Sequence, residues 1–290
     1  MFPKNHWQGY LLIGPALVLL VAFTHYPALA TIWHSFFSNA TAAREAHFVG
    51  LANYQTMVED PVFWQSLRNN AWFAFFTVPG SIVIAMAMAL LINAKLPGRG
   101  FLRLAYFTPT VLPMIAVANI WLFFYTPQYG LIAQLLAPFG LGSPNWLGDE
   151  DLALGSMIVV AIWKEAGFFM IFYLAALQQL SPSLAEAAAL EGASRWQYFW
   201  RVVFPLLMPT TIFVLVNALI NAVRMIDHVV VMTKGGPNNA STLLLYYIYQ
   251  VGFGFWDSAY AAALTVVVLV ALASVAILKF SYLDKKAHYQ

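Results

Sequence analysis

A row of polar side chains lies within one of the longer apolar stretches of the sequence. Its members are Asn217, Asn221, Arg224 and His228. Spacings of four, three and four residues place them on one face of a helix, and Asp227 lies next to that face. In a membrane-spanning helix such groups are costly and indicate function by default. Because amides and charged groups bind sugar hydroxyls, the row is typical of a water-filled pathway for a hydroxylated solute.

A second apolar stretch carries a compatible set of side chains: Trp163, Lys164, Glu165 and Phe168. The ring of Trp163 or Phe168 can pack on the face of a sugar. Lys164 and Arg224 together could admit a solute with an anionic group. A structural interpretation stays open, because asparagines also bridge neighbouring helices and Arg224 could pair with Asp227 at i, i+3.

The composition indicates a membrane protein. Hydrophobic residues make up 61% of the 290 residues and charged residues 9%, with a mean hydropathy of +0.72. Soluble domains carry about 25% charged residues, and a soluble chain this poor in charge would expose large apolar patches. The net charge of +2 is too small to indicate a nucleic-acid partner. We therefore expect an all-α integral membrane protein in contact with lipid.

Six apolar segments reach the length of about 20 residues that a spanning helix needs. They are residues 10–32, 71–93, 104–126, 154–177, 204–230 and 259–280. The first also resembles a secretory signal, with Lys4 before the apolar run. An uncleaved anchor fits better, because the run is too long for the apolar core of a signal. The prediction is a single multi-pass domain, 1–290, with six transmembrane helices.

The positions of Lys and Arg predict the orientation, since both favour the cytoplasmic side of short loops. One side of the six-span arrangement holds nine of them: Lys4, Lys95, Arg99, Arg103, Arg195, Arg201, Lys279, Lys285 and Lys286. The other side holds three: Arg44, Arg68 and Lys234. Both termini and the loops 94–103 and 178–203 are therefore expected in the cytoplasm. The loops 33–70, 127–153 and 231–258 are expected outside.

The longest cytoplasmic loop is predicted to contain a short helix at about 182–192. Ser181 can cap it, Pro182 suits its first position, and Gly192 suits its end. The residues between are mostly Ala and Leu, which favour helix. Such a helix either packs on its own bundle or lets another protein approach its small side chains closely. The residues alone leave both alternatives open.

The residue inventory argues against chemistry within the chain itself. It has no cysteine, so thiolate nucleophiles and cysteine metal sites are excluded. Its six histidines lack the spacing of metal ligands. It has no Gly-x-x-x-x-Gly-Lys-Ser/Thr loop to hold ATP phosphates. We therefore predict no catalytic residue, no metal site and no cofactor in this chain.

The loop helix carries the strongest resemblance to a known family. Glu186-Ala187-Ala188 with Gly192, followed by Phe204-Pro205-Leu206 and Pro209, resembles the permeases of ATP-binding-cassette (ABC) importers. In that family the residue before the glycine is usually Asp, whereas here it is Glu191. The resemblance implies a type I importer permease fold. It also implies that this loop is a coupling helix formed by Glu186, Ala187, Ala188, Glu191 and Gly192, which sits in a cleft of an ATPase subunit.

Further motifs extend the resemblance over nearly the whole chain. They are Phe48-Val49-Gly50-Leu51-x-Asn53-Tyr54, Asp60-Pro61-x-Phe63-Trp64, Arg99-Gly100-Phe101-x-Arg103, Trp163-Lys164, Ala175-Ala176-Leu177-Gln178 and Thr233-x-Gly235-Gly236-Pro237. Together they resemble the carbohydrate branch of the family, which transports maltose-like sugars, polyols and glycerol phosphate compounds. In this branch the middle of the fifth span and the adjoining fourth span line the solute site, which favours the pathway interpretation of the polar rows.

The resemblance also implies partners and a location. We expect a second, similar permease, two ATPase subunits that bind ATP and Mg, and an external solute-binding protein, all at a bacterial inner membrane. Two other functions remain as alternatives. A membrane-embedded transferase would need a cluster of acids or histidines near one interface. A stand-alone secondary transporter would need no docking helix and typically shows matched half-repeats.

Overall fold

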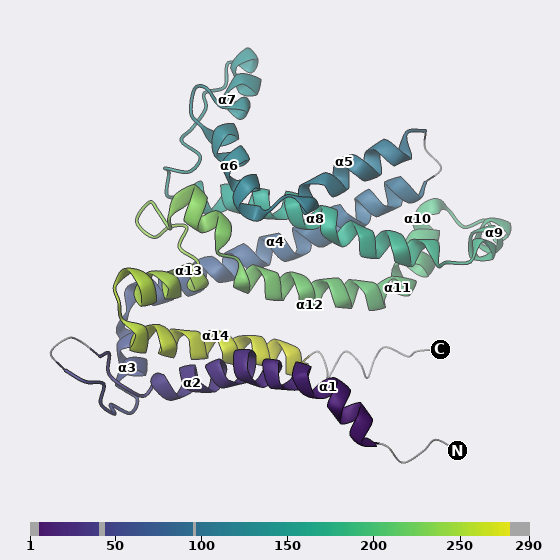
Figure 1. The fold of residues 1–290 in the computed structure, drawn as a ribbon. Coiled ribbons are helices and arrows are strands. Elements are labelled where there is room, and N and C mark those ends of the chain that lie inside the picture. Colours follow the sequence, from purple (N-terminus) through teal and green to yellow (C-terminus); the bar gives the residue numbers. More distant parts are fainter. Residues whose placement is uncertain (1–5, 41–43, 95–96, 279–290) are drawn as a thin grey trace. The chain divides into compact units, whose positions relative to one another are not determined.

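The structure is a computed structural model that describes residues 6–40, 44–94 and 97–278 (Figure 1). Within these residues the chain is helical, and its β pairing is limited to isolated bridge residues, including an antiparallel bridge between Phe37 and Phe48. The chain forms two compact units. The first comprises Met1–Pro61 and Ile248–Ala271, and the second comprises Val62–Tyr247 and Leu272–Gln290. The all-α prediction is confirmed for the described residues.

The first unit contains the first expected span as one apolar helix. Its elements are α1 (His6–Leu20), a π-helical turn (Val21–His25), α2 (Tyr26–His34), α3 (Ala52–Glu59), a second π-helical turn (Gln250–Gly254) and most of α14 (Ser258–Leu278). The first turn joins α1 and α2 into a continuous apolar stretch, Tyr10–His34, whose most apolar part buries no residue. Its side chains are therefore available to lipid or to another protein.

Polar side chains fix the start of α14 within this unit. Asn39 donates its amide to the carbonyl of Trp256 and accepts from the hydroxyl of Ser258. The phenol of Tyr260 donates to the carboxylate of Asp60 at 2.6 Å. The described apolar part of α14, Ser258–Ser274, is shorter than a full span. The last two residues of the expected sixth span, 279–280, lie outside the described residues.

The second unit is a bundle around α8. Its elements are α4 (Pro61–Asn93), α5 (Arg99–Val111), α6 (Met114–Tyr125), α7 (Leu131–Leu136), a 3-10 turn (Ala137–Phe139), α8 (Ala153–Gln178), α9 (Pro182–Leu190), α10 (Arg195–Tyr198), a π-helical turn (Phe199–Val203), α11 (Phe204–Leu206), α12 (Met208–Arg224), a π-helical turn (Val229–Thr233) and α13 (Leu244–Tyr249). Phe73, Phe169, Tyr173 and Leu207 are fully buried in the core between them. Gly167 lets α5 approach closely, since an added Cβ would lie 2.3 Å from the carbonyl oxygen of Tyr106.

Three expected spans differ from the structure. Helix α4 begins at Pro61, ahead of the expected residue 71, because proline suits the first helical turn and the polar residues before 71 are helical too. The third span is two helices, α5 and α6, bent by 105° (Figure 1). Pro113 explains the bend, because it lacks an N–H group and disfavours helical geometry at Leu112. The fifth span breaks at Met225, where ψ is 118°.

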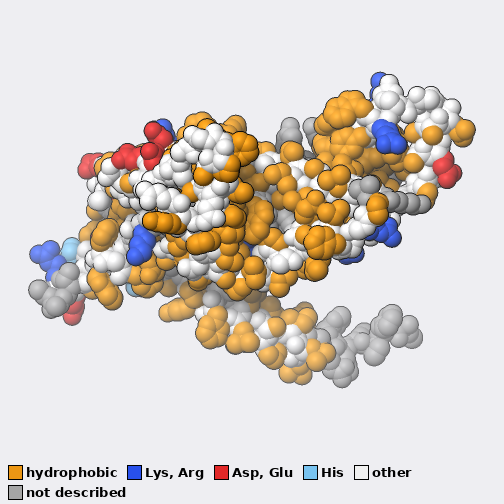
Figure 2. Space-filling view, turned by 90° about the horizontal axis from the view of Figure 1, so that it is seen from above, with side chains coloured by type: hydrophobic (Ala, Val, Ile, Leu, Met, Phe, Trp, Pro, Cys, Tyr) orange, Lys and Arg blue, Asp and Glu red, His pale blue; other side chains and the backbone are white. Residues whose placement is uncertain are grey.

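The described residues contain four helices that are long and apolar enough to cross a membrane, or five if the bent pair is one span. Figure 2 shows apolar side chains over most of the visible surface and few charged ones. This is the surface expected of a protein that lies in a bilayer. Six spans in one permease domain, with both termini in the cytoplasm, stay predictions.

Two buried asparagines of α4 hold the segment that follows α12. Asn69 donates to the carbonyls of Asn239 and Thr242 at 2.9 and 3.0 Å. Asn70 donates to the carbonyl of Ala222 at 3.3 Å and accepts from the N–H of Leu244 at 3.1 Å. These bonds satisfy backbone groups that a helix break leaves without partners.

The orientation can be tested with reporter fusions. We expect fusions at residues 98, 190 and 288 to report the cytoplasm and fusions at 50, 145 and 240 to report the outside. The reason is the excess of Lys and Arg on one side. Residue 288 and the cations Lys4, Lys95, Lys279, Lys285 and Lys286 lie outside the described residues. An external report from residue 190 would contradict the whole assignment.

Candidate functional site

A cleft of about 340 Å³ opens where the start of α6 and the end of α12 meet the middle of α8. It is lined by Met114, Lys164, Glu165, Asn221, Arg224, Met225, Ile226 and Asp227. Met114 begins α6 just after the bend, and Arg224 ends α12. Lys164 and Glu165 lie near the midpoint of α8. The cleft thus gathers four formally charged side chains and one amide midway along long apolar helices.

Lys164 stabilises the bend in the third span. Its ammonium group donates a hydrogen bond to the carbonyl oxygen of Leu112, the residue between α5 and α6. The extended geometry of Leu112 (ψ 137°) turns this carbonyl away from the helical pattern. An unpaired carbonyl is costly away from water. One charge of the cleft therefore has a structural role.

We expect Lys164→Met to destabilise the protein. Removing one partner of a hydrogen bond to a charged group costs about 1–3 kcal/mol, and each kcal/mol lowers the melting temperature by about 2–4 °C in a chain of this size. Thermal unfolding of the purified protein measures the change. Lys234→Met is the matched control, because Lys234 is exposed and lies outside the cleft. Equal melting temperatures for the two variants would contradict the structural role.

The other polar groups of the cleft leave hydrogen-bonding capacity open. The amide of Asn221 donates to the carboxylate of Glu165 at 3.0 Å. Lys164 interacts electrostatically with Glu165 and Asp227. Arg224 and Asp227 are both exposed, and in the part of the chain that the structure describes no ion pair joins them. The expected structural pair at i, i+3 is therefore not formed, and the guanidinium of Arg224 faces the cleft with free donors.

A second candidate surface is α9, which lies outside the membrane-length helices. None of its residues is buried, and the side chain of Leu190 is 91% exposed. Its end is a Schellman motif: the N–H groups of Gly192 and Ala193 donate to the carbonyls of Ala189 and Ala188, with Gly192 at φ +73°. The predicted helix and its glycine stop are confirmed. Ser181 holds the cap position, but its hydroxyl bonds that of Ser183 instead of the backbone.

Comparison with known families identifies the chain. Residues 81–288 match the model of the family described as "Binding-protein-dependent transport system inner membrane component". The chain belongs to this family. It is therefore a transport component of the inner membrane, and the predicted membership is confirmed.

The curated relatives of this permease include transport proteins named for sugars and for glycerol phosphate. It is 35% identical over 247 residues to the trehalose/maltose permease MalF of Thermococcus litoralis, covering 84% of each chain. It is 33% identical over 258 residues to the sulfoquinovosyl glycerol permease SmoG of Agrobacterium fabrum, covering 89% of this chain and 84% of that one. It is 31% identical over 288 residues to the sn-glycerol-3-phosphate permease UgpA of Escherichia coli, covering 99% and 97%.

A solved structure supports the fold. The permease matches a chain of a bacterial ABC transporter that imports the acidic polysaccharide alginate, with a TM-score of 0.87, 22% identity and coverage of 98% and 97%. A second structure of such a transporter, in complex with an alginate-bound periplasmic protein, matches with a TM-score of 0.83, 23% identity and coverage of 95% of each chain. Both matches show the fold, and the family match with the curated relatives shows the role: the chain is the permease subunit of an ABC importer.

The structure brings only some of the predicted pathway residues of the permease together. Lys164, Asn221, Arg224 and Asp227 line the cleft. Asn217 does not, and its amide donates to the carbonyl of Phe213 in its own helix at 2.7 Å. Trp163 and Phe168 do not line the cleft either; each is 38% exposed, with Trp163 edge-on to Trp121 and Phe168 edge-on to Phe172. Whether any of these residues contacts solute stays a prediction.

His228 does not continue the polar row. The break at Met225 separates it from α12, and its side chain is fully buried against the ring of Phe73 at 5.5 Å. Neither ring nitrogen has a hydrogen-bond partner among the described residues. The expectation of four side chains on one helical face is therefore wrong at its fourth member.

Two residues outside the predicted site contribute to it. Glu165 follows the predicted pathway residue Lys164 in the sequence, and it is the hydrogen-bond partner of Asn221. Asn70 was missed, and its amide holds the last turn of α12 next to the cleft. The available signal was the Asn69-Asn70 pair just before an apolar run. Two adjacent amides at such a place indicate buried backbone that needs partners.

Proposed function

We propose that this permease works with a second permease of its family, two ATPase subunits that bind ATP and Mg, and an external solute-binding protein. Together they carry a sugar, polyol or glycerol-phosphate-type solute across the inner membrane. The observation that carries the proposal is the charged cleft between the middle of α8 and the end of α12. A polar site at this depth is too costly to persist unless it serves a solute pathway or a structural contact.

The chemistry of the cleft suits a hydroxylated solute. Hydroxyl groups both donate and accept, and the cleft presents donors on Arg224 and Asn221 and acceptors on Glu165 and Asp227. The guanidinium of Arg224 can also bind a phosphate or sulfonate through two parallel hydrogen bonds. Relatives are named for both kinds of solute: trehalose and maltose are neutral, whereas glycerol 3-phosphate is an anion.

The exposed helix α9 supports the coupling part of the proposal. Leu190 would leave an apolar side chain in water unless a partner covers it. Ala187 and Ala189 are small enough to let a partner surface approach α9 closely. We infer that α9, with Glu186, Ala187, Ala188, Glu191 and Gly192, docks on an ATPase subunit. Closure of the ATPase dimer would then move α9 and switch the pathway between its two openings.

The test is reconstitution of the permease with the ATPase subunits, second permease and external protein that co-purify with it. We expect ATP hydrolysis that rises when the external protein carries its solute, and the solute is identified from that protein. Arg224→Gln should lower uptake of an anionic solute about tenfold, the effect of one charge-assisted bond. Arg44→Gln is the control, because Arg44 lies outside the cleft. A rate of ATP hydrolysis that is the same with and without the solute-loaded external protein would refute the proposal.

A further inference from the structure

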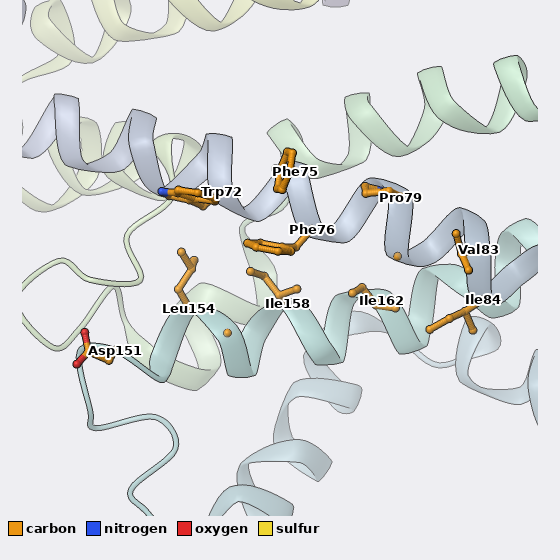
Figure 3. A pocket seen from close by; sticks show the side chains of 12 residues that line it. Trp72, Phe75, Phe76, Pro79, Val83, Ile84, Asp151, Leu154, Ile158 and Ile162 are labelled. Carbon is orange, nitrogen blue, oxygen red and sulfur yellow. The ribbon is translucent and has the colours of Figure 1, made fainter.

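An apolar groove of about 750 Å³ runs between α4 and α8 on the second unit (Figure 3). Its walls include Phe76, Pro79, Ile158 and Ile162, and Trp72 stacks on Phe76 with the ring planes 15° apart. From Trp72 to Ile84 the wall extends about 18 Å at 1.5 Å per residue. One leaflet of a bilayer contributes about half of a 30 Å hydrocarbon core. The groove therefore has the length of a lipid tail.

One end of the groove is charged. A second hollow of about 560 Å³ shares Trp72, Asp151 and Leu154 with the groove and adds the charges of Arg68 and Glu150. Figure 3 shows Asp151 at this end, next to the start of α8. Within the described residues Arg68 forms no ion pair, whereas Glu150 already accepts a hydrogen bond from Asn238. The polar end thus offers a free guanidinium beside two carboxylates.

The two parts together match a phospholipid in form and charge. An apolar trough suits an acyl chain, and Arg68 suits a phosphate. Arg68 against Glu150 and Asp151 leaves a formal charge of −1 on the polar end, which disfavours a headgroup with net negative charge. A primary ammonium has three N–H donors for these carboxylates, whereas a quaternary ammonium has none. Trp64 and Trp72 at this end prefer the depth of lipid headgroups.

We propose that this groove is a binding site for one phospholipid of the phosphatidylethanolamine class. Its phosphate lies on Arg68, its ammonium group on Asp151 and Glu150, and one acyl chain fills the trough between α4 and α8. The site is separate from the solute cleft, since the two share no lining residue.

A helix of a second permease copy is a poorer occupant. The first apolar span, residues 10–34, is the helix with the most uncovered apolar surface, and it contains no Asp, Glu, Lys or Arg. Placed on the groove it would cover Arg68 and Asp151 without supplying charges for them, which is costly. A zwitterionic headgroup supplies both. Charge complementarity therefore favours the lipid.

The first experiment measures which lipid the assembled transporter retains. The transporter is equilibrated with equal amounts of phosphatidylethanolamine, phosphatidylcholine and phosphatidylglycerol, and bound lipid is counted by native mass spectrometry. We expect phosphatidylethanolamine to exceed phosphatidylglycerol about tenfold. Asp151→Asn should remove most of that preference, because it takes away the negative charge of the polar end, whereas Arg68→Gln should lower the retained amount of phosphatidylethanolamine, because it takes away the partner of the phosphate. Arg44→Gln and Glu45→Gln are the matched controls, because both residues are exposed and lie outside the groove. Equal retention of all three lipids by the unaltered transporter would overturn the proposal.

The second experiment tests the trough. Gly155 lines the groove, and an added Cβ there meets no atom within 4 Å, so Gly155→Leu fills the trough without a backbone clash. Gly14→Leu is the control at a helical glycine that is equally open. We expect Gly155→Leu to lose bound lipid at an unchanged melting temperature. Full retention of lipid by Gly155→Leu would contradict acyl-chain binding in the groove. Displacement of the lipid by soluble phosphoethanolamine at equal concentration would contradict it too, because that molecule has no acyl chain. Loss of the second permease from Gly155→Leu, with no lipid on the unaltered transporter, would assign the groove to that subunit.

Discussion

Replacing Gly192 with valine should lower ATP-driven uptake about tenfold or more while the permease still inserts in the membrane. Gly192 ends α9 at φ +73°, a conformation that costs an L-residue about 1–2 kcal/mol and a β-branched one more. That cost is enough to change the population of the native helix end about tenfold. No atom lies within 4 Å of an added Cβ, so the effect comes from backbone strain rather than from a clash. Because α9 buries no residue, the rest of the fold should be unaffected.

Glu186→Lys should produce the same phenotype by another route. Glu186 is exposed on α9, and reversing its charge disturbs a docking surface without disturbing the core. Both variants are measured for uptake and for ATP hydrolysis stimulated by the loaded external protein. Gly192→Asn is the matched control, because asparagine tolerates this conformation. Unchanged stimulation in both Gly192→Val and Glu186→Lys would refute coupling through α9.

Cysteines at positions 217, 221 and 224 should react with small water-soluble thiol reagents in the assembled transporter. The chain has no cysteine of its own, so each signal is unambiguous. Residue 224 is exposed in the cleft and should react fastest, whereas 221 is half-buried and 217 lies outside the cleft lining. Excess solute should slow labelling at 224 and 221 about tenfold if it occupies the same space.

The control for this experiment needs a position that is open. Gly142 is exposed, and a Cβ added there meets no atom within 4 Å. Inert cysteines at 217, 221 and 224 beside a reactive cysteine at 142 would show that the polar row is structural.

The spans that could be predicted well are those whose sequence signals agree with one another. Helix α8 starts and ends within one residue of the expected 154–177, because no proline interrupts this largely apolar stretch. The end of α9 follows from one glycine. The bend between α5 and α6 could not be predicted, since hydropathy measures composition and not direction. Pro109 and Pro113 lie close together, but α5 continues through the first and ends before the second.

The sequence predicted the residues of the candidate site correctly only as far as Arg224, where α12 ends. Asn221 and Arg224 share a face and a cleft, as their spacing indicates. The break at Met225 contains neither proline nor glycine, so no local signal revealed that His228 would turn into the core. The spacing did not show that Asn217 lies outside the cleft lining, because an amide in a helix can donate to the carbonyl four residues earlier instead.

The double hydrogen bond of Asn70 has a mechanical consequence. One side chain joins the last turn of α12, at Ala222, to the first residue of α13, at Leu244. The two ends of residues 222–244 are thereby held together by one side chain of α4. If the cleft at Arg224 widens during transport, residues 222–244 must either move as one rigid body together with the part of α4 around Asn70, or break the two buried hydrogen bonds of Asn70. The side chain of Asn70 therefore couples any movement at the end of α12 to the start of α13 and to α4.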